Sequence, residues 1–435
     1  MSSEKAAHHL ATKILWGLVI GIVAGIVTVG IGRFSPGVLS FAQSASEHVL
    51  NPFGQVFLRM LFFVVIPLVF ASLALGIVQL GNIARLGPLA GRTAGFFFMN
   101  MAIGAFLALV MMNVLNPGGS LDEATQEKLR TEFVGKAQDV EEVRKNQAKI
   151  NFNTLVEMFM PRNLMQSVVQ FQILPLILFA ILLGAAGTQM AEDRRKRFED
   201  FLSIVAELMT KIVHFALLLA PYAVPALIFS AIVNVGLDFL LSLMYFVIAS
   251  LMIMVIHLFG TMSVWLKVFT KRSPLAFFRS IRAVLITAFS TSSSNATLPT
   301  SLQVSREGLG VSNSTSGFVL PLGATMNMSG TALYEGCVVL FIAQVYGVEL
   351  SIANQLTLLL LTVFSAIAVA GIPGGSLPII AGLLISFNIP AEGLALIIGV
   401  DRLLDMARTT VNVGADIVTA TIVDEQLKKK AVAST

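Results

Sequence analysis

The sequence predicts an all-α membrane protein whose chain crosses the bilayer many times. Of its 435 residues, 56% are hydrophobic and only 12% are charged, whereas soluble domains carry about 25% charged residues. The mean hydropathy is +0.83, and long apolar stretches recur at 14–31, 61–78, 94–115, 168–186 and 239–266. A helix of roughly 18 apolar residues suffices to span a bilayer. These observations argue strongly against a soluble enzyme.

The first apolar run, 14–31, is predicted to be a retained helix, because no small-residue cleavage site of a signal peptide follows it. Basic residues then mark one side of the membrane, and they cluster at 85–92, 194–197, 267–282 and 428–430. Because loops rich in Lys and Arg stay in the cytoplasm, we expect these segments and both chain termini to be cytoplasmic. The protein should be a multi-pass protein of the cell (inner or plasma) membrane.

One long polar segment, 122–149, interrupts the apolar pattern. It carries seven acidic and six basic residues, and this near-neutral balance does not oppose its translocation. We therefore expect an extracytoplasmic insertion that forms a solvated excursion.

Two polar segments rich in small residues interrupt the apolar C-terminal half. Residues 291–299 read TSSSNATLP, and residues 370–378 read AGIPGGSLP. Irregular backbone at membrane depth is tolerated only where it is buried in protein or lines a wet cavity. The two breaks therefore indicate a binding site near the bilayer midplane, with ordinary surface loops as the alternative.

The segment 400–416 concentrates polar residues in an otherwise apolar chain. On a helix with about 100° per residue, they share a stripe roughly 100° wide. The members of this stripe are Asp401, Asp405, Arg408, Thr409, Asn412 and Asp416. Because a charge at the bilayer centre costs at least about 2.5–3.5 kcal/mol by insertion scales, the stripe needs partners or a ligand. Asp405 suits a substrate ammonium and Arg408 a carboxylate held in a two-pronged contact. An internal Asp–Arg pair that only locks helices is the alternative.

A second polar cluster, 323–331, surrounds Asn327 with glycine and hydroxyl residues. Backbone carbonyls freed there can bind a desolvated sodium ion, and Asp416 offers a further hard oxygen ligand. Glu335 follows as one of only three charged residues between 308 and 400. Burial favours the neutral form of a carboxyl group, so Glu335 is a candidate proton carrier, with a permanently protonated structural glutamate as the alternative.

Other classes of function find little support. The net charge of +4 is too small and too scattered for nucleic-acid binding. The single cysteine, Cys337, excludes an internal disulfide, and the histidines lack metal-binding spacing. A serine hydrolase built on 291–294 lacks a His or Lys base in its motif, so we expect no enzyme activity and no covalently bound cofactor. An anion-conducting channel is the alternative from another class.

The chain resembles the dicarboxylate/amino acid:cation symporter family, which includes archaeal aspartate transporters and human excitatory amino acid transporters. The resemblance covers 14–425 and rests on four motifs in order: TSSSNATLP, NMSGTALYEG, AGIPGG and DMARTTVNVGAD. It implies eight transmembrane helices plus two re-entrant helical hairpins, with tips at 292–296 and 371–376. It also implies a homotrimer with the glutamate-transporter (elevator) fold.

The resemblance further implies a division between a fixed scaffold and a moving transport domain. Residues 1–90 form the first two helices, mainly scaffold, and 91–116 form the third helix, in the transport domain. Residues 117–162 hold the polar insertion and the start of the fourth helix. Residues 163–236 form the fourth and fifth helices of the trimerisation scaffold. Residues 237–435 form the rest of the transport domain: the sixth helix, first hairpin, seventh helix, second hairpin and eighth helix.

The resemblance assigns Asp405 to the amino group of a substrate and Arg408 to its side-chain carboxylate. The other implied substrate-binding residues are Ser292, Ser293, Ser294, Thr331, Gly371, Ile372, Ser376, Thr409 and Asn412. Arg408 favours an acidic amino acid, since neutral amino acid relatives lack it, and Asp405 argues against plain dicarboxylates. One methylene is worth only about 1–3 kcal/mol in a pocket, so both L-glutamate and L-aspartate stay candidates.

The resemblance also implies the coupling ions. An intact sodium site would comprise Gly323, Asn327, Asn412 and Asp416. A second would use backbone oxygens near Thr325, Met328, Ala366 and Val369. A third site is degenerate, because its usual ligands are replaced by Phe97, Asn100, Met101 and Ser329. Glu335 matches the glutamate that carries the proton in proton-coupled eukaryotic members.

We therefore expect a symporter of L-glutamate or L-aspartate that uses protons and fewer sodium ions. A purely sodium-coupled carrier of the same amino acids is the alternative. One departure from the family concerns Asp401, because the two positions where relatives hold a nearby arginine are Ser292 and Met406 here. Arg402 is expected to face elsewhere.

Overall fold

The computed structural model describes residues 3–83, 87–119, 121, 126, 160–170, 173–369 and 374–433. Every regular element among these residues is a helix, which confirms the predicted all-α class. The α-helices are α1 (Ser3–Gly32), α2 (Pro36–Ala45), α3 (Asn51–Ile83), α4 (Pro88–Leu115), α8 (Leu164–Val169), α9 (Ile173–Thr188), α10 (Glu192–Val235), α11 (Leu237–Val255), α12 (Met262–Thr270), α13 (Pro274–Ser280), α14 (Arg282–Thr291), α15 (Ser294–Gln303), α16 (Asn313–Met326), α17 (Ser329–Val345), α18 (Ile352–Ala368), α19 (Leu377–Ser386) and α20 (Leu394–Ala433). Short π-helices are η1 (Ser46–Leu50), η3 (Ile256–Thr261) and η4 (Val304–Gly308), and η5 (Ala391–Gly393) is a 3₁₀-helix.

Within the described residues, six helical segments are long and apolar enough to cross a membrane. They are Thr12–Gly32, Pro36–Gln79, Pro88–Leu115, Glu192–Val235, Phe239–Thr270 and Asn313–Val345. Shorter apolar helices are Pro175–Thr188, Arg282–Thr291, Ile352–Ile367 and Leu377–Ser386. This pattern fits a polytopic membrane protein, whereas eight spanning helices and the division into scaffold and transport domain stay predictions. The insertion 122–149 lies outside the described residues except for Gln126.

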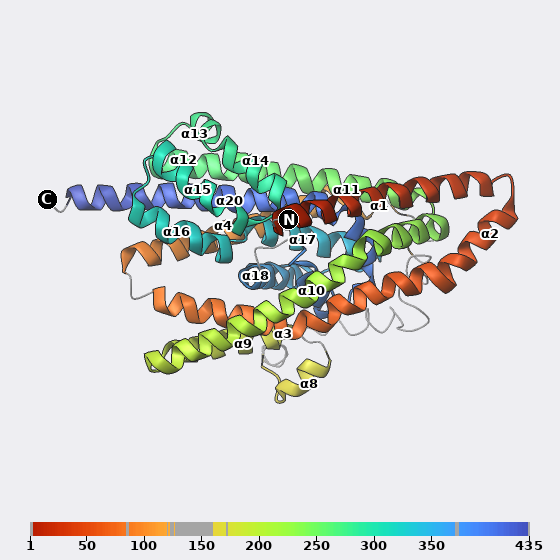
Figure 1. Ribbon diagram of the computed structural model, residues 1–435, viewed down its shortest axis with the longest axis horizontal. Helices are drawn as coiled ribbons and strands as arrows, with labels where there is room; N and C mark the ends of the chain where they lie inside the picture. The colour runs from red at the N-terminus through yellow and green to blue at the C-terminus, as the bar shows by residue number, and fades with distance from the viewer. Residues whose placement is uncertain are drawn as a thin grey trace.

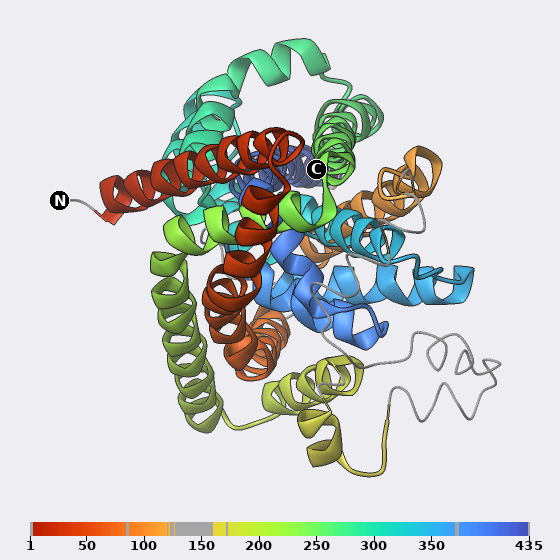
Figure 2. The same cartoon turned by 90° about the vertical axis from the view of Figure 1, so that its right-hand side faces the viewer.

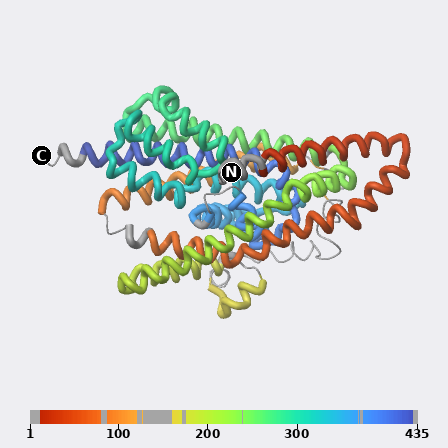
Figure 3. The backbone as a smooth tube through the Cα atoms, viewed as in Figure 1, coloured from red at the N-terminus to blue at the C-terminus, as the bar shows by residue number. Residues whose placement is uncertain are grey.

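The N-terminal helices form a layer along one side of the molecule. The chain reverses direction at α2, and α3 then runs back toward the opposite end of the molecule (Figure 3). The long α10 packs against both α1 and α3. Figure 2 shows α10, in green, along the outer edge of the bundle. A Cβ at Gly21 of α1 would lie only 2.7 Å from the carbonyl oxygen of Pro225 in α10. Glycine therefore lets the two backbones approach closely, as small residues do in membrane helix pairs.

Two helix–turn–helix units interrupt the C-terminal half. In the first, α14 ends and α15 begins around Ser292, which has a left-handed φ of +50°. The hydroxyl of Ser293 accepts a hydrogen bond from Ala296 N at 3.2 Å and so caps α15. The break is thus shorter than the predicted tip 292–296, because this cap restores the helix from Ser294. In the second unit α18 and α19 contact each other, and 370–373, which precede α19, lie outside the described residues.

Helix α17 lies in the centre of the molecule. All of its residues except Gln344 are buried, and it packs against α4, α18 and α20. Its Phe341 ring stacks on Phe246 of α11 with 4.3 Å between ring centroids. In Figure 1 the last helix, α20, extends along the long axis of the molecule to the free C-terminal end. Polar groups on α17 are consequently enclosed by protein.

Charged groups near the C-terminal end of α20, outside the six apolar segments, tie several elements together. Arg272 Nε lies 2.6 Å from Glu425 Oε1. Asp424 Oδ1 accepts from the hydroxyl of Ser312 at 2.6 Å, and Lys428 Nζ lies 2.6 Å from Asp424 Oδ2. Because Ser312 is the N-cap of α16, this cluster holds the start of α16 against α20.

We expect Asp424→Ala to lower the free energy of unfolding at neutral pH by about 1 kcal/mol, because Ser312 loses its acceptor. Burial alone would raise the pKa of Asp424, but hydrogen bonds from Lys428 and Ser312 hold that pKa below its ordinary value of 3.8. A lowered pKa stabilises the folded protein above the unfolded value, and this contribution is lost as pH falls through the folded value.

The difference in thermal unfolding midpoint between wild type and Asp424→Ala in detergent should therefore be largest near pH 7 and become smaller below about pH 4. Asp200→Ala, at an exposed position, serves as the control and should stay near wild type. A difference for Asp424→Ala that is equally large at pH 7 and at pH 3 would contradict the electrostatic origin.

Candidate functional site

Helices α16 and α17 are separated by a short unwound segment, Asn327 and Met328. Asn412 of α20 bridges this gap. Its Oδ1 accepts from the N–H groups of Gly330 and Thr331 at 2.7 and 3.3 Å, and its Nδ2 donates to Thr331 Oγ1 at 3.2 Å. The amide thus caps the first turn of α17 and joins the polar stripe of α20 to the unwound segment.

The polar stripe of α20 faces the interior, as its spacing predicts. Its six members, Asp401, Asp405, Arg408, Thr409, Asn412 and Asp416, are at most 5% exposed. Leu403, on the other side of the helix, is 36% exposed. The stripe therefore has protein partners along its length, and these define the site.

Asp405 and Arg408 form a buried ion pair at the centre of the stripe. Arg408 Nε and Nη2 both lie 2.8 Å from Asp405 Oδ1, and each residue is 2% exposed. Their spacing of three residues places them on adjacent turns of one helix face. A charge pair taken out of water in this way costs desolvation energy, and each partner is strongly destabilised if the other is removed.

Two residues just before α19, Gly374 and Ser376, contact this ion pair. The N–H of Gly374 donates to Asp405 Oδ2 at 3.1 Å, and Arg408 Nη1 donates to the hydroxyl of Ser376. Gly374 has φ +74°, a conformation that favours glycine. The end of the turn before α19 is thereby held directly by the two charged side chains.

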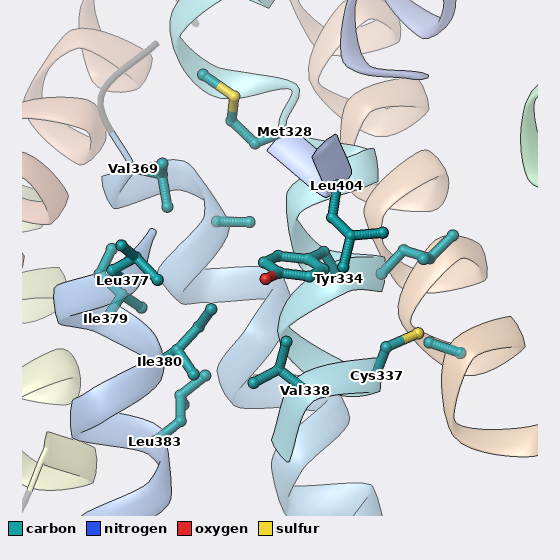
Figure 4. Packing of buried hydrophobic residues seen from close by; sticks show 14 of the residues in the cluster. Met328, Tyr334, Cys337, Val338, Val369, Leu377, Ile379, Ile380, Leu383 and Leu404 are labelled. Carbon is teal, nitrogen blue, oxygen red and sulfur yellow. The ribbon is translucent and has the colours of Figure 1, made fainter. Parts of the chain in front are cut away.

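Tyr334 of α17 joins the cluster and was not predicted from the sequence. Its hydroxyl donates to Asp401 Oδ1 at 2.8 Å, and its ring centroid lies 5.2 Å from the Arg408 guanidinium carbon, within the range of a cation–π contact. Figure 4 shows the ring beside Leu404 of α20, with its hydroxyl directed toward the α19 side. Asp401 thus has a hydroxyl donor where relatives are expected to hold an arginine.

Arg402 was expected to face elsewhere than Asp401, and it joins the site at Asp405 instead. It is only 8% exposed, and its Nη1 lies 3.5 Å from Asp405 Oδ2. The reason is again the spacing of three residues, which brings Arg402 next to Asp405 rather than next to Asp401. Asp405 consequently lies between two guanidinium groups.

The remaining predicted substrate residues fall into three groups. Thr331 and Thr409 are buried with the stripe. Ser292, Ser293 and Ser294 lie at the junction of α14 and α15, two helices that pack against α20. Among the described residues, neither Asp405 nor Arg408 hydrogen-bonds to this turn. Gly371 and Ile372 lie outside the described residues.

Three of the four predicted ligands of the first sodium site lie together. Asn327 Nδ2 donates to Asp416 Oδ1 at 2.8 Å, and a Cβ at Gly323 would collide with the same carboxylate. Among the described residues, the buried Asn327 Oδ1 has no hydrogen-bond partner. A buried carboxylate beside an unpaired carbonyl oxygen suits a hard cation such as sodium. Asn412, the fourth, instead directs its oxygen to α17.

The residues predicted for the second sodium site are less closely associated. Met328 accepts a hydrogen bond through its sulfur from Asn412 Nδ2 at 3.2 Å, and Thr325 is exposed. Ala366 and Val369 lie at the end of α18, which contacts α16. The Ala366 carbonyl already accepts from Val369 N at 3.3 Å.

The residues that replace the ligands of the third sodium site are Phe97, Asn100, Met101 and Ser329, and all four are buried. Neither Phe97 nor Met101 offers a hard oxygen ligand. Asn100 Nδ2 is directed to Thr419 Oγ1 at 3.2 Å. Among the described residues, the buried Asn100 Oδ1 and Ser329 Oγ have no hydrogen-bond partner, so the degeneracy of the third sodium site stays a prediction.

Glu335 of α17 is fully buried. Its Oε2 accepts from the hydroxyl of Ser365 in α18 at 2.6 Å, and its Oε1 has no hydrogen-bond partner in the part of the chain that the structure describes. An isolated buried carboxylate with one hydroxyl donor is poorly compensated in the ionised form, so the geometry suits a group that takes up a proton. Ser365, like Tyr334, was not predicted from the sequence.

Comparison with known proteins identifies the family. Residues 10–426 match the family model described as the sodium:dicarboxylate symporter family. A proton/sodium-glutamate symport protein of Geobacillus stearothermophilus is 32% identical over 410 residues, which cover 93% of this chain and 91% of the relative. A proton/glutamate-aspartate symporter of Escherichia coli (strain K12) is 30% identical over 93% of this chain and 90% of the relative. The human neutral amino acid transporter A is 29% identical over 95% of this chain and 81% of the relative. The chain therefore belongs to the sodium:dicarboxylate symporter family, whose members are membrane transporters and not enzymes.

Proposed function

We propose that the protein is a secondary active symporter of L-glutamate or L-aspartate. The observation that carries this proposal is the buried pair of Asp405 and Arg408, closed by Gly374 and Ser376. The two similar bacterial relatives are named glutamate or glutamate-aspartate symporters, which supports the same substrate class.

An acidic amino acid can replace the internal partners of both residues. Its ammonium group takes the place of the Arg408 guanidinium at Asp405, and its side-chain carboxylate takes the place of Asp405 at Arg408 in a two-pronged contact. A plain dicarboxylate offers no ammonium group, so Asp405 would face it as an unpaired like charge. The substrate must displace the contacts of Gly374 and Ser376, and this makes the turn before α19 the candidate gate.

Protons and a reduced number of sodium ions drive this transport in the proposal. Glu335 carries the proton, because it is buried with a single donor. Sodium binds at Asp416 and Asn327, where a carboxylate and an unpaired carbonyl oxygen meet. The poor ligands at the third sodium site support a reduced number of coupled sodium ions.

Transport proceeds by an elevator mechanism within a homotrimer in this proposal, with 91–116 and 237–435 moving against 1–90 and 163–236. The contacts of Asn412 with α17 and the cluster around Asp424 tie α16, α17 and α20 to one another. These contacts support movement of the three helices as one body.

The proposal is tested by uptake of radiolabelled L-glutamate and L-aspartate into proteoliposomes, with proton and sodium gradients imposed independently. We expect accumulation above the outside concentration when only an inward proton gradient is present, with a further rise when sodium is added. Accumulation that requires a sodium gradient and ignores pH would support the sodium-only alternative. A pure channel would not accumulate substrate against its gradient.

A further inference from the structure

Glu335 and Ser365 form a hydrogen bond between two different helices of the site. Ser365 Oγ lies 2.6 Å from Glu335 Oε2, a separation typical of a charge-assisted bond from a hydroxyl to a carboxylate. Both side chains are fully buried. Ser365 is the only hydrogen-bond partner of Glu335 among the described side chains, since Oε1 has none. A change in the protonation of this carboxyl group therefore first alters its hydrogen bond to α18.

Ser365 has a second acceptor within reach, the backbone carbonyl of Thr362 at 3.3 Å. A hydroxyl group carries one proton and can also accept. When Glu335 is ionised, Ser365 donates to the carboxylate, because a charged acceptor forms the stronger bond. When a proton from water binds Oε2, the carboxyl O–H donates to Ser365 Oγ, and Ser365 turns its own proton to the Thr362 carbonyl. One proton enters, and every donor keeps an acceptor.

We propose that Ser365 is a positioning residue for the proton on Glu335, and that the reversal of its hydrogen bond reports the protonation state to α18. This inference rests on the proposed proton role of Glu335. Helix α18 packs against α19, and Gly374 and Ser376 just before α19 hold Asp405 and Arg408. Ser365 thus connects the proton site to the gate of the substrate site.

Few other charged groups lie on the elements packed against α17. Helices α18 and α19 carry none, α4 carries only Arg92 and α11 only Asp238, both near the first turn. Helix α20 carries the buried groups Asp401, Arg402, Asp405, Arg408 and Asp416, with Asp424, Glu425 and Lys428 toward its C-terminal end, and η3 carries the ionisable His257. None of these groups hydrogen-bonds to Glu335 in the described structure. Among the described side chains, the hydroxyl of Ser365 is therefore the group that a change of charge on Glu335 affects through a hydrogen bond.

The test is the pH dependence of proton-driven L-aspartate uptake in proteoliposomes for Ser365→Ala, Glu335→Gln and the double variant. Ser365→Ala removes the donor that favours the ionised form, so the pH of half-maximal uptake should move about one unit toward alkaline values. Ser365→Thr keeps the hydroxyl and should restore the wild-type profile. Thr357→Val removes another hydroxyl of the same helix, one that bonds to the Ala353 carbonyl, and it should leave the profile unmoved.

Because Glu335→Gln should no longer accumulate substrate on a proton gradient, the double variant is compared with Glu335→Gln by the pH dependence of L-aspartate exchange, where Ser365→Ala should cause no further change. A loss of maximal rate in Ser365→Ala without a shift of the profile would indicate a purely structural serine and overturn the role given to Ser365. A shift that persists in the double variant would overturn it as well. If Glu335→Gln alone keeps the wild-type pH dependence, the proton role of Glu335 has failed, and the inference fails with it.

Discussion

Arg408→Lys is expected to lower the affinity for L-glutamate and L-aspartate by roughly 10- to 150-fold. Lysine keeps the positive charge beside Asp405, but its ammonium cannot form the two parallel hydrogen bonds that a guanidinium offers to a carboxylate. A hydrogen bond to a charged group is worth about 1.5–3 kcal/mol, which corresponds to this loss of affinity. Equilibrium binding of radiolabelled amino acid to the purified protein measures it.

Arg402→Lys is the matched control for this prediction. Arg402 is also buried on α20 and also faces Asp405, but its Nη1 is 3.5 Å away and forms no hydrogen bond to that carboxylate. The same substitution there should change the affinity by less than about threefold. Equal losses in Arg402→Lys and Arg408→Lys would mean that general damage to the cluster, not the grip on substrate, causes the effect.

Glu335→Gln is expected to abolish the ability of a proton gradient to drive accumulation, while exchange of internal for external substrate continues. Glutamine has nearly the same shape as glutamate and can still hydrogen-bond to Ser365, so the fold should be retained. It cannot gain or lose a proton, and the empty carrier can therefore no longer return with a change of protonation. Counterflow assays at equal pH and uptake under an imposed pH gradient separate the two activities.

Glu349→Gln makes the same substitution at an exposed glutamate of the chain and should leave both assays unchanged. Proton-driven accumulation by Glu335→Gln at the wild-type level would remove the proposed proton carrier. Loss of exchange together with accumulation would instead point to a structural requirement for the acid.

Much of the fold follows from patterns within single segments. The apolar stretches become helices because a helix satisfies every backbone polar group within the membrane. The cluster 323–331 becomes an unwound segment at Asn327 and Met328, as its glycine and polar composition indicates. The start of α15 at Ser294 could not be predicted, since the cap by Ser293 depends on local geometry that composition does not reveal.

The candidate site likewise contains residues that the sequence predicts and residues that it does not. The stripe on α20 could be predicted, because the spacing of Asp405, Arg408 and Asp416 on one helix determines that they share a face. Tyr334 and Ser365 could not, because their importance comes from contacts with other helices. Ser365 is 30 positions from Glu335 in the chain, and a serine in an apolar helix resembles any small residue that eases packing. The burial of a side chain and the identity of its partner depend on the tertiary structure.

The most direct test of the substrate site compares the binding of L-aspartate and succinate to the wild type and to Asp405→Asn. Succinate is aspartate without the amino group, so the ratio of the two affinities isolates the ammonium contact and cancels general damage to the protein. We expect the wild type to prefer L-aspartate, and Asp405→Asn to lose at least about tenfold of that preference, because the ammonium no longer meets a charged acceptor. An unchanged ratio in Asp405→Asn would show that Asp405 does not bind the amino group, and the proposed pairing of acid and base with an acidic amino acid would be wrong.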